Sequence, residues 1–234
     1  MTVGLALKIK DGVVLACDSQ ATAGGNAPYQ KSTSKLEQLD NYHGLVMAGA
    51  ESVSKLLTYR IKELLQKEQK PDTPKIAEMV YEIMASLYQQ YAKGFGGMEV
   101  PALASQIPSQ FLIGGWDESR GPQIWAVNSP GLYHPVDEWD TIGSGTFYAG
   151  TILKKEFAPN MGMHRGHFLA TRAVVEASEM DPYVGGKIRM ATISPHSDLG
   201  FLEIEGYAEA KYKPMVEEVA RMIREWEEDL DRGG

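Results

Sequence analysis

Large apolar side chains alternate with small or polar ones along residues 2–9, which is the pattern of a β-strand with one buried face. A turn signal at residues 10–12 leads directly into a second apolar run at residues 13–17. The four large apolar side chains of the first strand share one face: Val3, Leu5, Leu7 and Ile9. We therefore predict a hairpin whose strands bring the start of the chain and Asp18 to the same end.

Further strands and helices follow from the spacing of apolar residues along the rest of the chain. Period-two or short apolar runs predict strands, and apolar positions three and four apart predict amphipathic helices. The predicted strands are 35–39, 45–47, 110–116, 123–127, 186–193 and 201–206, and the predicted helices are 51–67, 76–91, 146–157 and 164–179. This order, with pairs of helices between groups of strands, predicts two sheets packed between helix layers.

Three segments interrupt or extend this pattern. Residues 21–34 are polar and glycine-rich and predict a loop. Residues 92–109 contain three glycines and two prolines and predict a loop insertion, either over a substrate channel, at a subunit contact, or as an ordinary surface insertion. Residues 213–232 predict a C-terminal helix whose single apolar stripe packs on its own domain or on a neighbouring subunit. At 234 residues, we expect one domain over 1–234.

Composition excludes several classes of function. The net charge is −8 and the sequence has no basic stripe, so a nucleic-acid partner is not expected. The sequence contains no run of eighteen apolar residues and does not begin with a secretory signal, so we expect no membrane association. Cys17 is the single cysteine and cannot form an internal disulfide. Together these features favour the cytoplasm.

Cysteine and histidine offer little chemistry of their own. Cys17 lies in an apolar run, where cysteine behaves as a small hydrophobic residue rather than a nucleophile. His164 and His167 stand three apart on a predicted helix, but no carboxylate at a matching interval completes a metal site, and we expect them on a solvated face. The other three histidines, His43, His134 and His196, fall in predicted turns without identifiable partners. We expect no metal and no cofactor.

The candidate chemistry starts at Thr2, directly behind Met1. The small threonine side chain is accepted by methionine aminopeptidases, and trimming would leave one residue with both a hydroxyl and a free α-amine. Such an amine can act as the base that activates a threonine nucleophile. At pH 7 only about a sixth of an ordinary α-amine is neutral and able to accept a proton. A nearby cation such as Lys35 would raise that share, and Asp18 would pair with the Lys35 ammonium.

These residues belong to longer stretches that resemble one family. The stretches are TVGLALKIKDGVVLACDSQATAGG, SKLEQLDNYHGLVMAGA, IGSG at 142–145 and MDPYVGGKIRMATIS at 180–194. They resemble the catalytic β subunits of the proteasome and of the related bacterial ATP-dependent two-component protease. The resemblance implies an α+β fold of the N-terminal-nucleophile hydrolase type, a four-layer αββα sandwich with two antiparallel sheets between helix layers.

The resemblance also implies roles for individual residues. Thr2 is the expected nucleophile, Asp18 and Lys35 the charged pair, and the Gly49 backbone N–H the oxyanion donor. Ser144 and Asp181 match the positions that hold the Thr2 amine and hydroxyl. Thr22 and Met47 are the expected substrate-binding residues, and Met47 indicates an apolar preference. One position departs from the family: Val184 stands where a serine is usual, so one hydrogen bond is missing.

Three functions are compatible with these residues. The first is a threonine peptidase that cleaves peptides or unfolded proteins through an acyl-enzyme, in a homo-oligomeric ring that an ATP-driven unfoldase can feed. The second is a ring scaffold without catalysis, which Val184 favours. The third is a transpeptidase, in which an amine rather than water resolves the acyl-enzyme. The sequence does not separate hydrolysis from transfer.

Overall fold

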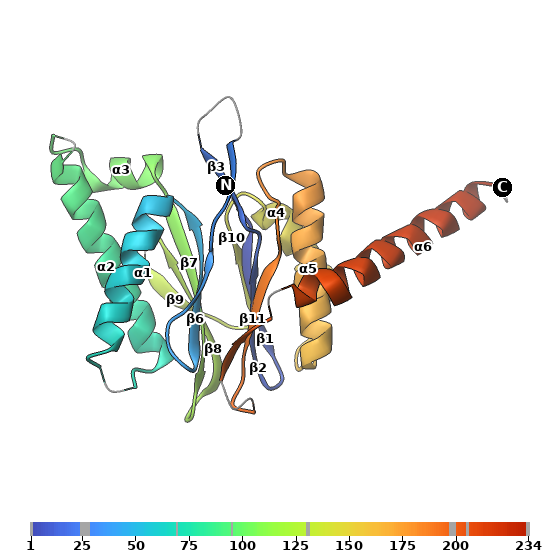
Figure 1. Cartoon of the computed structure of the whole chain (residues 1–234), viewed down its shortest axis with the longest axis horizontal. Coiled ribbons are helices and arrows are strands. Elements are labelled where there is room, and N and C mark those ends of the chain that lie inside the picture. Colours follow the sequence, from blue (N-terminus) through green and yellow to red (C-terminus); the bar gives the residue numbers. More distant parts are fainter. Residues whose placement is uncertain are drawn as a thin grey trace.

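Two five-stranded antiparallel sheets face each other in the middle of the molecule (Figure 1). The computed structural model describes residues 2–23, 29–68, 70–94, 96–129, 132–196, 200–204 and 206–232, and the side chains at 22–23, 29–31 and 227–232 are outside the description. The first sheet has the order β10-β1-β2-β11-β12, with bounds Trp139–Ile142, Gly4–Ile9, Gly12–Cys17, Arg189–Ile193 and Phe201–Glu203. The second has the order β5-β6-β7-β8-β9, with bounds Leu36–Gln38, His43–Gly49, Ser109–Asp117, Gly121–Asn128 and Tyr133–Val136.

Helices cover the outer face of each sheet (Figure 1). Helices α1 (Glu51–Leu65) and α2 (Thr73–Gly94) pack on the second sheet. Helices α4 (Thr146–Glu156) and α5 (Met163–Met180) pack on the first sheet. The result is the predicted αββα sandwich. The longer helices and strands follow one another as the apolar pattern predicts, whereas the short strands β9 and β10 were not predicted.

Three apolar layers hold these elements together, because strand side chains alternate between the two faces of a sheet. On β1, Leu5 and Leu7 point toward α4 and α5, whereas Ala6 points between the sheets. All three are fully buried. Burying a leucine side chain contributes about 1.5–3 kcal/mol relative to leaving it exposed. The predicted division of β1 into two faces is therefore confirmed.

Two predicted loops are wrong in part. Where the sequence predicts a loop over 21–34, β3 (Gln20–Ala23) and β4 (Tyr29–Ser32) form a two-stranded antiparallel ribbon. Glycines 24 and 25 and Pro28 of that prediction lie outside the described residues. Where it predicts a loop over 92–109, α2 continues to Gly94 and α3 occupies Val100–Gln106, with Pro101 in its first turn. These three elements, β3, β4 and α3, are too short to give a clear apolar period, so the local pattern did not reveal them.

Helix α6 (Lys213–Arg232) extends away from the body of the molecule after a π-helical turn, η1 (Ala208–Tyr212) (Figure 1). Its first turns pack on α5, and Val216 is buried there. Beyond them, the exposed fraction of the residue is 58% at Met222 and 65% at Trp226. The predicted apolar stripe therefore covers its own domain only at the start of the helix.

The sequence predicts both histidines of α5 on a solvated face, which holds for the exposed His164 and is wrong for His167. His167 is buried, and its Nε2 lies 2.6 Å from Thr192 Oγ1 on β11. Nδ1 of His164 and Nδ1 of His167 lie 3.0 and 3.4 Å from the Tyr212 hydroxyl of η1. Burial and the nearby charges of His164 and Lys211 lower the pKa of His167 to about 4. The neutral ring thus joins α5, β11 and η1, a contact between distant segments that spacing within α5 could not predict.

His43 also differs from the prediction of a turn residue without partners. It is the first residue of β6 and is buried. Its Nδ1 lies 2.9 Å from both carboxylate oxygens of Asp40, and its Nε2 lies 3.5 Å from Asp117 Oδ1. Asp117 comes from the end of β7, which pairs with β6 in the register His43 to Gly115. Sheet pairing, rather than local sequence, therefore supplies this partner.

Candidate active site

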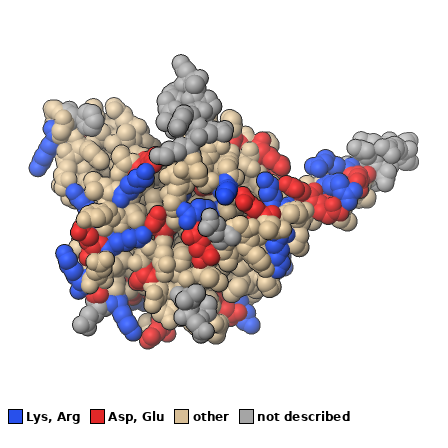
Figure 2. Space-filling model, viewed as in Figure 1, with Lys and Arg blue, Asp and Glu red and all other residues tan. Residues whose placement is uncertain are grey.

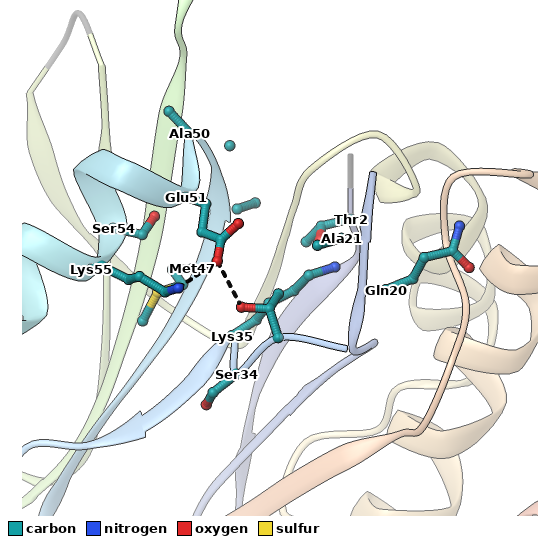
Figure 3. Close-up of a pocket in the computed structure, with 13 residues that line it drawn as sticks. Thr2, Gln20, Ala21, Ser34, Lys35, Met47, Ala50, Glu51, Ser54 and Lys55 are labelled. Carbon is teal, nitrogen blue, oxygen red and sulfur yellow. Dashed lines mark hydrogen bonds and ion pairs between the residues drawn. The ribbon is translucent and has the colours of Figure 1, made fainter. Parts of the chain in front are cut away.

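A pocket of about 230 Å³ lies at the end of the sandwich where the chain begins. Three of the predicted site residues border it together: Thr2, Lys35 and Gly49. Met47, a predicted substrate-binding residue, borders it as well. In Figure 3, the Lys35 side chain extends toward Thr2 within this pocket.

The β1–β2 hairpin brings Thr2 and Asp18 to this end of the sheet. Gly4 pairs with Cys17, so the residues that flank the two strands are neighbours. The Val3 N–H donates to Asp18 Oδ1 at 3.0 Å, and the Asp18 N–H donates to the Val3 carbonyl at 3.2 Å. The predicted proximity of the chain start and Asp18 is therefore confirmed.

Asp18 is buried and both of its carboxylate oxygens are occupied. The Lys35 ammonium donates to Oδ1 at 2.8 Å, alongside the Val3 N–H. Oδ2 accepts from the Gln20 and Gly185 N–H groups, each at 3.1 Å. A buried ion pair needs this additional hydrogen bonding, because taking two charges out of water costs several kcal/mol per ion. The pair therefore fixes a positive charge beside Thr2.

The loop after β10 surrounds Thr2. The Gly145 N–H donates to the Thr2 carbonyl at 3.1 Å, and the Thr2 N–H donates to Ser144 Oγ at 3.3 Å. Gly143 has φ +93°, and a Cβ there would lie 2.2 Å from the Thr2 carbonyl oxygen. Only glycine fits at that distance and in that backbone conformation. In this chain Met1 precedes Thr2, so the donor to Ser144 is a peptide N–H, which trimming would replace by an amine.

Gly49 ends β6 in a conformation that also requires glycine. Its φ is +107°, and a Cβ would lie 2.0 Å from the Pro108 carbonyl oxygen. The Met47 N–H, two residues earlier, donates to the Lys35 carbonyl at 2.9 Å. This bond holds the segment that carries Lys35 against β6. Gly49 thus borders the pocket next to the Lys35 segment, and its role as an oxyanion donor stays a prediction.

Three predicted residues are less directly connected to Thr2. Asp181 follows α5, is buried, and accepts a hydrogen bond from the Tyr183 N–H at 2.9 Å. The described contacts include no hydrogen bond between Asp181 and Thr2, so that contact stays a prediction. Thr22 lies on β3, and its side chain is outside the description. Val184 is buried in the apolar layer beside α5, and its side chain lies against Gly145.

Four residues that hold this site were missed in the sequence. Gly185 donates to Asp18, and Gly143 and Gly145 enclose Thr2 as described above. Gln110 on β7 accepts a hydrogen bond from the Gly143 N–H at 3.0 Å. The glycines at 143, 145, 185 and 186 were a signal in the sequence, because glycine lets another backbone segment approach closely. Gln110 carried no such signal.

Cys17 takes no part in this chemistry. It is fully buried between the sheets, and burial, with the nearby Asp18 charge, raises the pKa of its thiol to about 12. A thiol with that pKa is protonated at neutral pH and is not a nucleophile.

Among the described residues, no helix has the length and apolar character needed to cross a membrane.

The two facing antiparallel sheets lie between helix layers, which is the sandwich fold of the N-terminal-nucleophile hydrolases. A threonine, a lysine and a glycine surround a pocket at one end of this sandwich. A comparison with protein families matches residues 2–193 to the family described as "Proteasome subunit". The chain belongs to the proteasome-subunit family.

Individual relatives agree with this assignment. The chain is 32% identical over 199 residues to "Proteasome subunit beta type-5" of Gallus gallus, covering 83% of this chain and 71% of that protein. It is 32% identical over 205 residues to "Proteasome subunit beta 1" of Thermococcus gammatolerans, covering 87% and 92%. A second protein named "Proteasome subunit beta 1", from Thermococcus kodakarensis, is 29% identical over 220 residues, covering 92% and 96%.

Proposed function

We propose that this chain is a threonine endopeptidase, a hydrolase with Thr2 as its N-terminal nucleophile once Met1 has been removed. One observation carries the proposal: Thr2, Lys35 and Gly49 border the same pocket, and the buried Asp18 anchors the Lys35 ammonium at 2.8 Å. This arrangement supplies a nucleophile, a fixed positive charge and a backbone N–H donor within one small space. Those are the groups that acyl transfer needs.

The proposed reaction starts at the freed α-amine of Thr2. Its neutral form accepts the proton of the Thr2 hydroxyl while Oγ1 attacks a peptide carbonyl. The oxyanion of the tetrahedral intermediate accepts a hydrogen bond from the Gly49 N–H. The C–N bond then breaks, the leaving amine takes the proton, and an ester remains on Thr2. Water hydrolyses that ester and restores the hydroxyl. The Lys35 charge favours the neutral amine throughout.

Ser144 has a supporting part in this proposal. Its hydroxyl lies 3.3 Å from the Thr2 nitrogen and 3.5 Å from the Thr2 carbonyl oxygen. After trimming, it is within reach of the amine and can hold it in one orientation. Asp181 is proposed to orient the same group, although its described hydrogen bond is with Tyr183.

We also propose that the chain works in a homo-oligomeric ring on peptides or unfolded protein, with an ATPase unfoldase as a possible partner. The relatives are named as proteasome subunits, which supports an assembly. The outer turns of α6 support it too, because Met222 and Trp226 are exposed and an apolar helix face is favoured against a partner. Electron microscopy of the purified protein tests this part. The expected compartment is the cytoplasm.

Intact mass spectrometry tests the chemistry. We expect the purified chain to lack Met1 and to gain one covalent adduct with an epoxyketone, a reagent for N-terminal threonine. The Thr2→Ala variant should form no adduct and should lose turnover by about 10⁴-fold or more. Its assembly and unfolding midpoint should stay close to those of the wild type, because the described hydrogen bonds of Thr2 are made by its backbone. A wild-type chain that retains Met1 in cells would contradict the proposal.

A catalytically silent ring scaffold is the second candidate, and Val184 is the observation that favours it. Val184 is buried against Gly145 and contributes an apolar contact instead of a hydroxyl next to the loop around Thr2. In that case, trimming of Met1 and ring assembly would be seen without any epoxyketone adduct. The same experiment therefore separates the two candidates. A peptide amine added as a competing acceptor would reveal transpeptidation as a joined product.

A further inference from the structure

A second cavity lies at the end of the sandwich opposite Thr2, and we call it the far-end cavity. Its volume is about 700 Å³, which falls within the roughly 300–1,000 Å³ of pockets that bind small molecules. Strand β6 runs from His43, which lines this cavity, to Gly49, which lines the active-site pocket. At roughly 3.3 Å per residue, about 20 Å of strand separate the two residues. The far-end cavity is therefore distinct from the site proposed for the chemistry of Thr2.

Three connections between elements supply most of the cavity wall. They are the turn before β6, the segment between α1 and α2, and the end of β7 with the turn that follows it. The Trp116 N–H donates to the Tyr42 carbonyl at 3.0 Å, which joins two of these connections. At the third, Asp72 Oδ1 accepts from the Lys75 N–H at 3.1 Å, in the first turn of α2. Hydrogen bonds thus fix the backbone on each side of the cavity.

Carboxylates outnumber basic groups in the lining. The acidic lining residues are Asp40, Glu68, Asp72, Asp117 and Glu118, and the basic ones are His43 and Lys70. Arg120, which is outside the lining, pairs with Asp72 at 2.8 Å. Negative charge remains in excess even when His43 is protonated and Arg120 is counted. A cleft lined mainly by one sign of charge concentrates ions of the opposite sign, so this cavity attracts cations.

The Asp117 carboxylate is the buried member of this set. The residue is only 6% exposed, and its Oδ1 accepts hydrogen bonds from the Thr73 N–H and hydroxyl at 3.0 and 2.8 Å. Its Oδ2 has no hydrogen-bond partner in the described part of the chain. A buried carboxylate oxygen without a partner is destabilising, because it has lost its hydrogen bonds to water. A cation in the cavity that Asp117 lines would compensate this charge.

Two aromatic residues distinguish the cavity from a metal site. Tyr42 is 43% exposed, and Trp116 packs partly on the layer between the sheets. The face of an aromatic ring attracts ammonium and guanidinium groups, and tryptophan does so most strongly. Among the described residues, no group of three His, Cys, Asp or Glu side chains could hold a metal ion. Carboxylates and aromatic rings around one cavity therefore favour an organic cation.

We propose that the far-end cavity binds an organic cation, which is a guanidinium or ammonium group on a short apolar stem. The group can belong to a free amine or to an arginine or lysine side chain of a peptide, since both present the same chemistry. Guanidinium is the better fit, because it is planar, stacks on aromatic rings and pairs bidentately with carboxylates. Leu65, Pro71 and Pro195 supply apolar lining for the stem. The inference does not depend on the function proposed for Thr2.

Isothermal titration calorimetry on the purified protein, in whatever assembly it forms, tests the inference with butylguanidinium, butylammonium and butyrate. Butylguanidinium should bind with a stoichiometry of about one per chain, butylammonium about threefold more weakly, and butyrate at least tenfold more weakly. A blocked glycine-arginine-glycine peptide and its citrulline counterpart separate the two sources of the cation. Tighter binding of the arginine peptide than of butylguanidinium assigns the cavity to peptides, and weaker binding assigns it to free amines. Butyrate binding as tight as that of butylguanidinium would overturn the inference.

Two variants of the lining keep the fold intact and test the location. Glu118→Gln removes one exposed carboxylate and should weaken butylguanidinium binding about fivefold, and Tyr42→Leu removes a ring and should weaken it about threefold. Asp117 is left unchanged, because its carboxylate also holds Thr73. Glu138→Gln is the matched control, since Glu138 is an exposed glutamate outside the lining, and its binding should equal that of the wild type. Equal affinities in the wild type, Glu118→Gln and Tyr42→Leu would show that the cation binds elsewhere.

Epoxyketone labelling separates this inference from the proposed chemistry. Protein labelled on Thr2, with its active-site pocket occupied, should bind butylguanidinium as tightly as the unlabelled protein. Loss of binding on labelling would place the cation in the active-site pocket and would overturn the inference alone. If no adduct forms, the peptidase proposal fails, and the Glu118 and Tyr42 variants still decide the inference.

Discussion

Each end of the sandwich contains one buried carboxylate next to a cation, and the two sites are built differently. At the pocket end, Asp18 accepts four hydrogen bonds, including that of the Lys35 ammonium. At the far end, Asp117 Oδ1 accepts from the Thr73 N–H and hydroxyl and lies 3.5 Å from His43 Nε2. Asp117 Oδ2 is buried and has no hydrogen-bond partner in the described part of the chain.

The choice of cation explains the difference. Lysine keeps its charge over the whole physiological range, whereas histidine titrates within it. Burial alone lowers the pKa of His43, but hydrogen bonds and charge from Asp117 and Asp40 outweigh it and raise the pKa to about 9. The Asp117 pKa is lowered, because hydrogen bonds from His43 and Thr73 outweigh its burial. The far end therefore holds a charge that depends on pH.

On the face that is visible in Figure 2, surface charge does not distinguish the two ends. On the face seen in Figure 2, Lys and Arg are interspersed with Asp and Glu over the described part of the body. The contrast lies in the buried groups, so the tests below act on those.

Removing the lysine should have the largest effect. Lys35→Ala leaves the Asp18 carboxylate buried without its cation, which costs about 3–5 kcal/mol. It should also abolish epoxyketone labelling, because the amine of Thr2 loses the charge that keeps it neutral. Chemical denaturation and adduct mass measure the two effects. Lys62→Ala, which removes a half-exposed partner of Glu37, is the control and should cost less than about 1 kcal/mol. If Lys35→Ala also lowers the free energy of unfolding by less than about 1 kcal/mol, the Asp18–Lys35 pair is not important for stability.

Raising the pH should weaken the far end only. A folded-state pKa raised from 6.5 to about 9 contributes stability that is complete below pH 6.5 and is lost as the pH rises through 9. The free energy of unfolding should therefore fall by up to about 3 kcal/mol between pH 6.5 and 9.

The His43→Gln variant provides the control for this pH dependence. It should be less stable at pH 6.5 than the wild type and should lack most of the decline between pH 6.5 and 9. The rate of epoxyketone labelling of His43→Gln, measured at pH 7.5, should match that of the wild type. Parallel pH profiles of unfolding for the two chains would assign the titration to another group.

Two glycines sharpen the comparison with smaller effects. A Cβ at Gly49 would lie 2.0 Å from the Pro108 carbonyl oxygen, and one at Gly115 would lie 2.3 Å from both His43 Cδ2 and Thr73 Oγ1. Alanine at either position should cost about 1–3 kcal/mol by overpacking. Gly49→Ala should also slow epoxyketone labelling, whereas Gly115→Ala should not. Thermal unfolding and labelling rates measure both, and equal labelling of the two variants would remove Gly49 from the site.

The sequence was informative where neighbours in the chain are also neighbours in space. The alternation at residues 3–9 and the turn at 10–12 were enough to bring Asp18 beside Val3, because hairpin register follows from strand length and turn position. The longer helices and central strands were predicted for the same reason. The short elements α3, β3, β4, β9 and β10 were not, since each has too few residues for a period to appear.

Thr2, its proposed charged pair and the sandwich of two sheets between helices were predicted from residue types and order, whereas the proposed role of Gly49 came from the family resemblance. Folding supplied the rest: Gly145 meets Thr2 across more than half the chain, Gly185 reaches Asp18, and His43 finds Asp117 across a strand pair. These contacts depend on how separate elements pack. Local periodicity reports only which face of each element is buried, so it contains no information about which distant group will lie opposite.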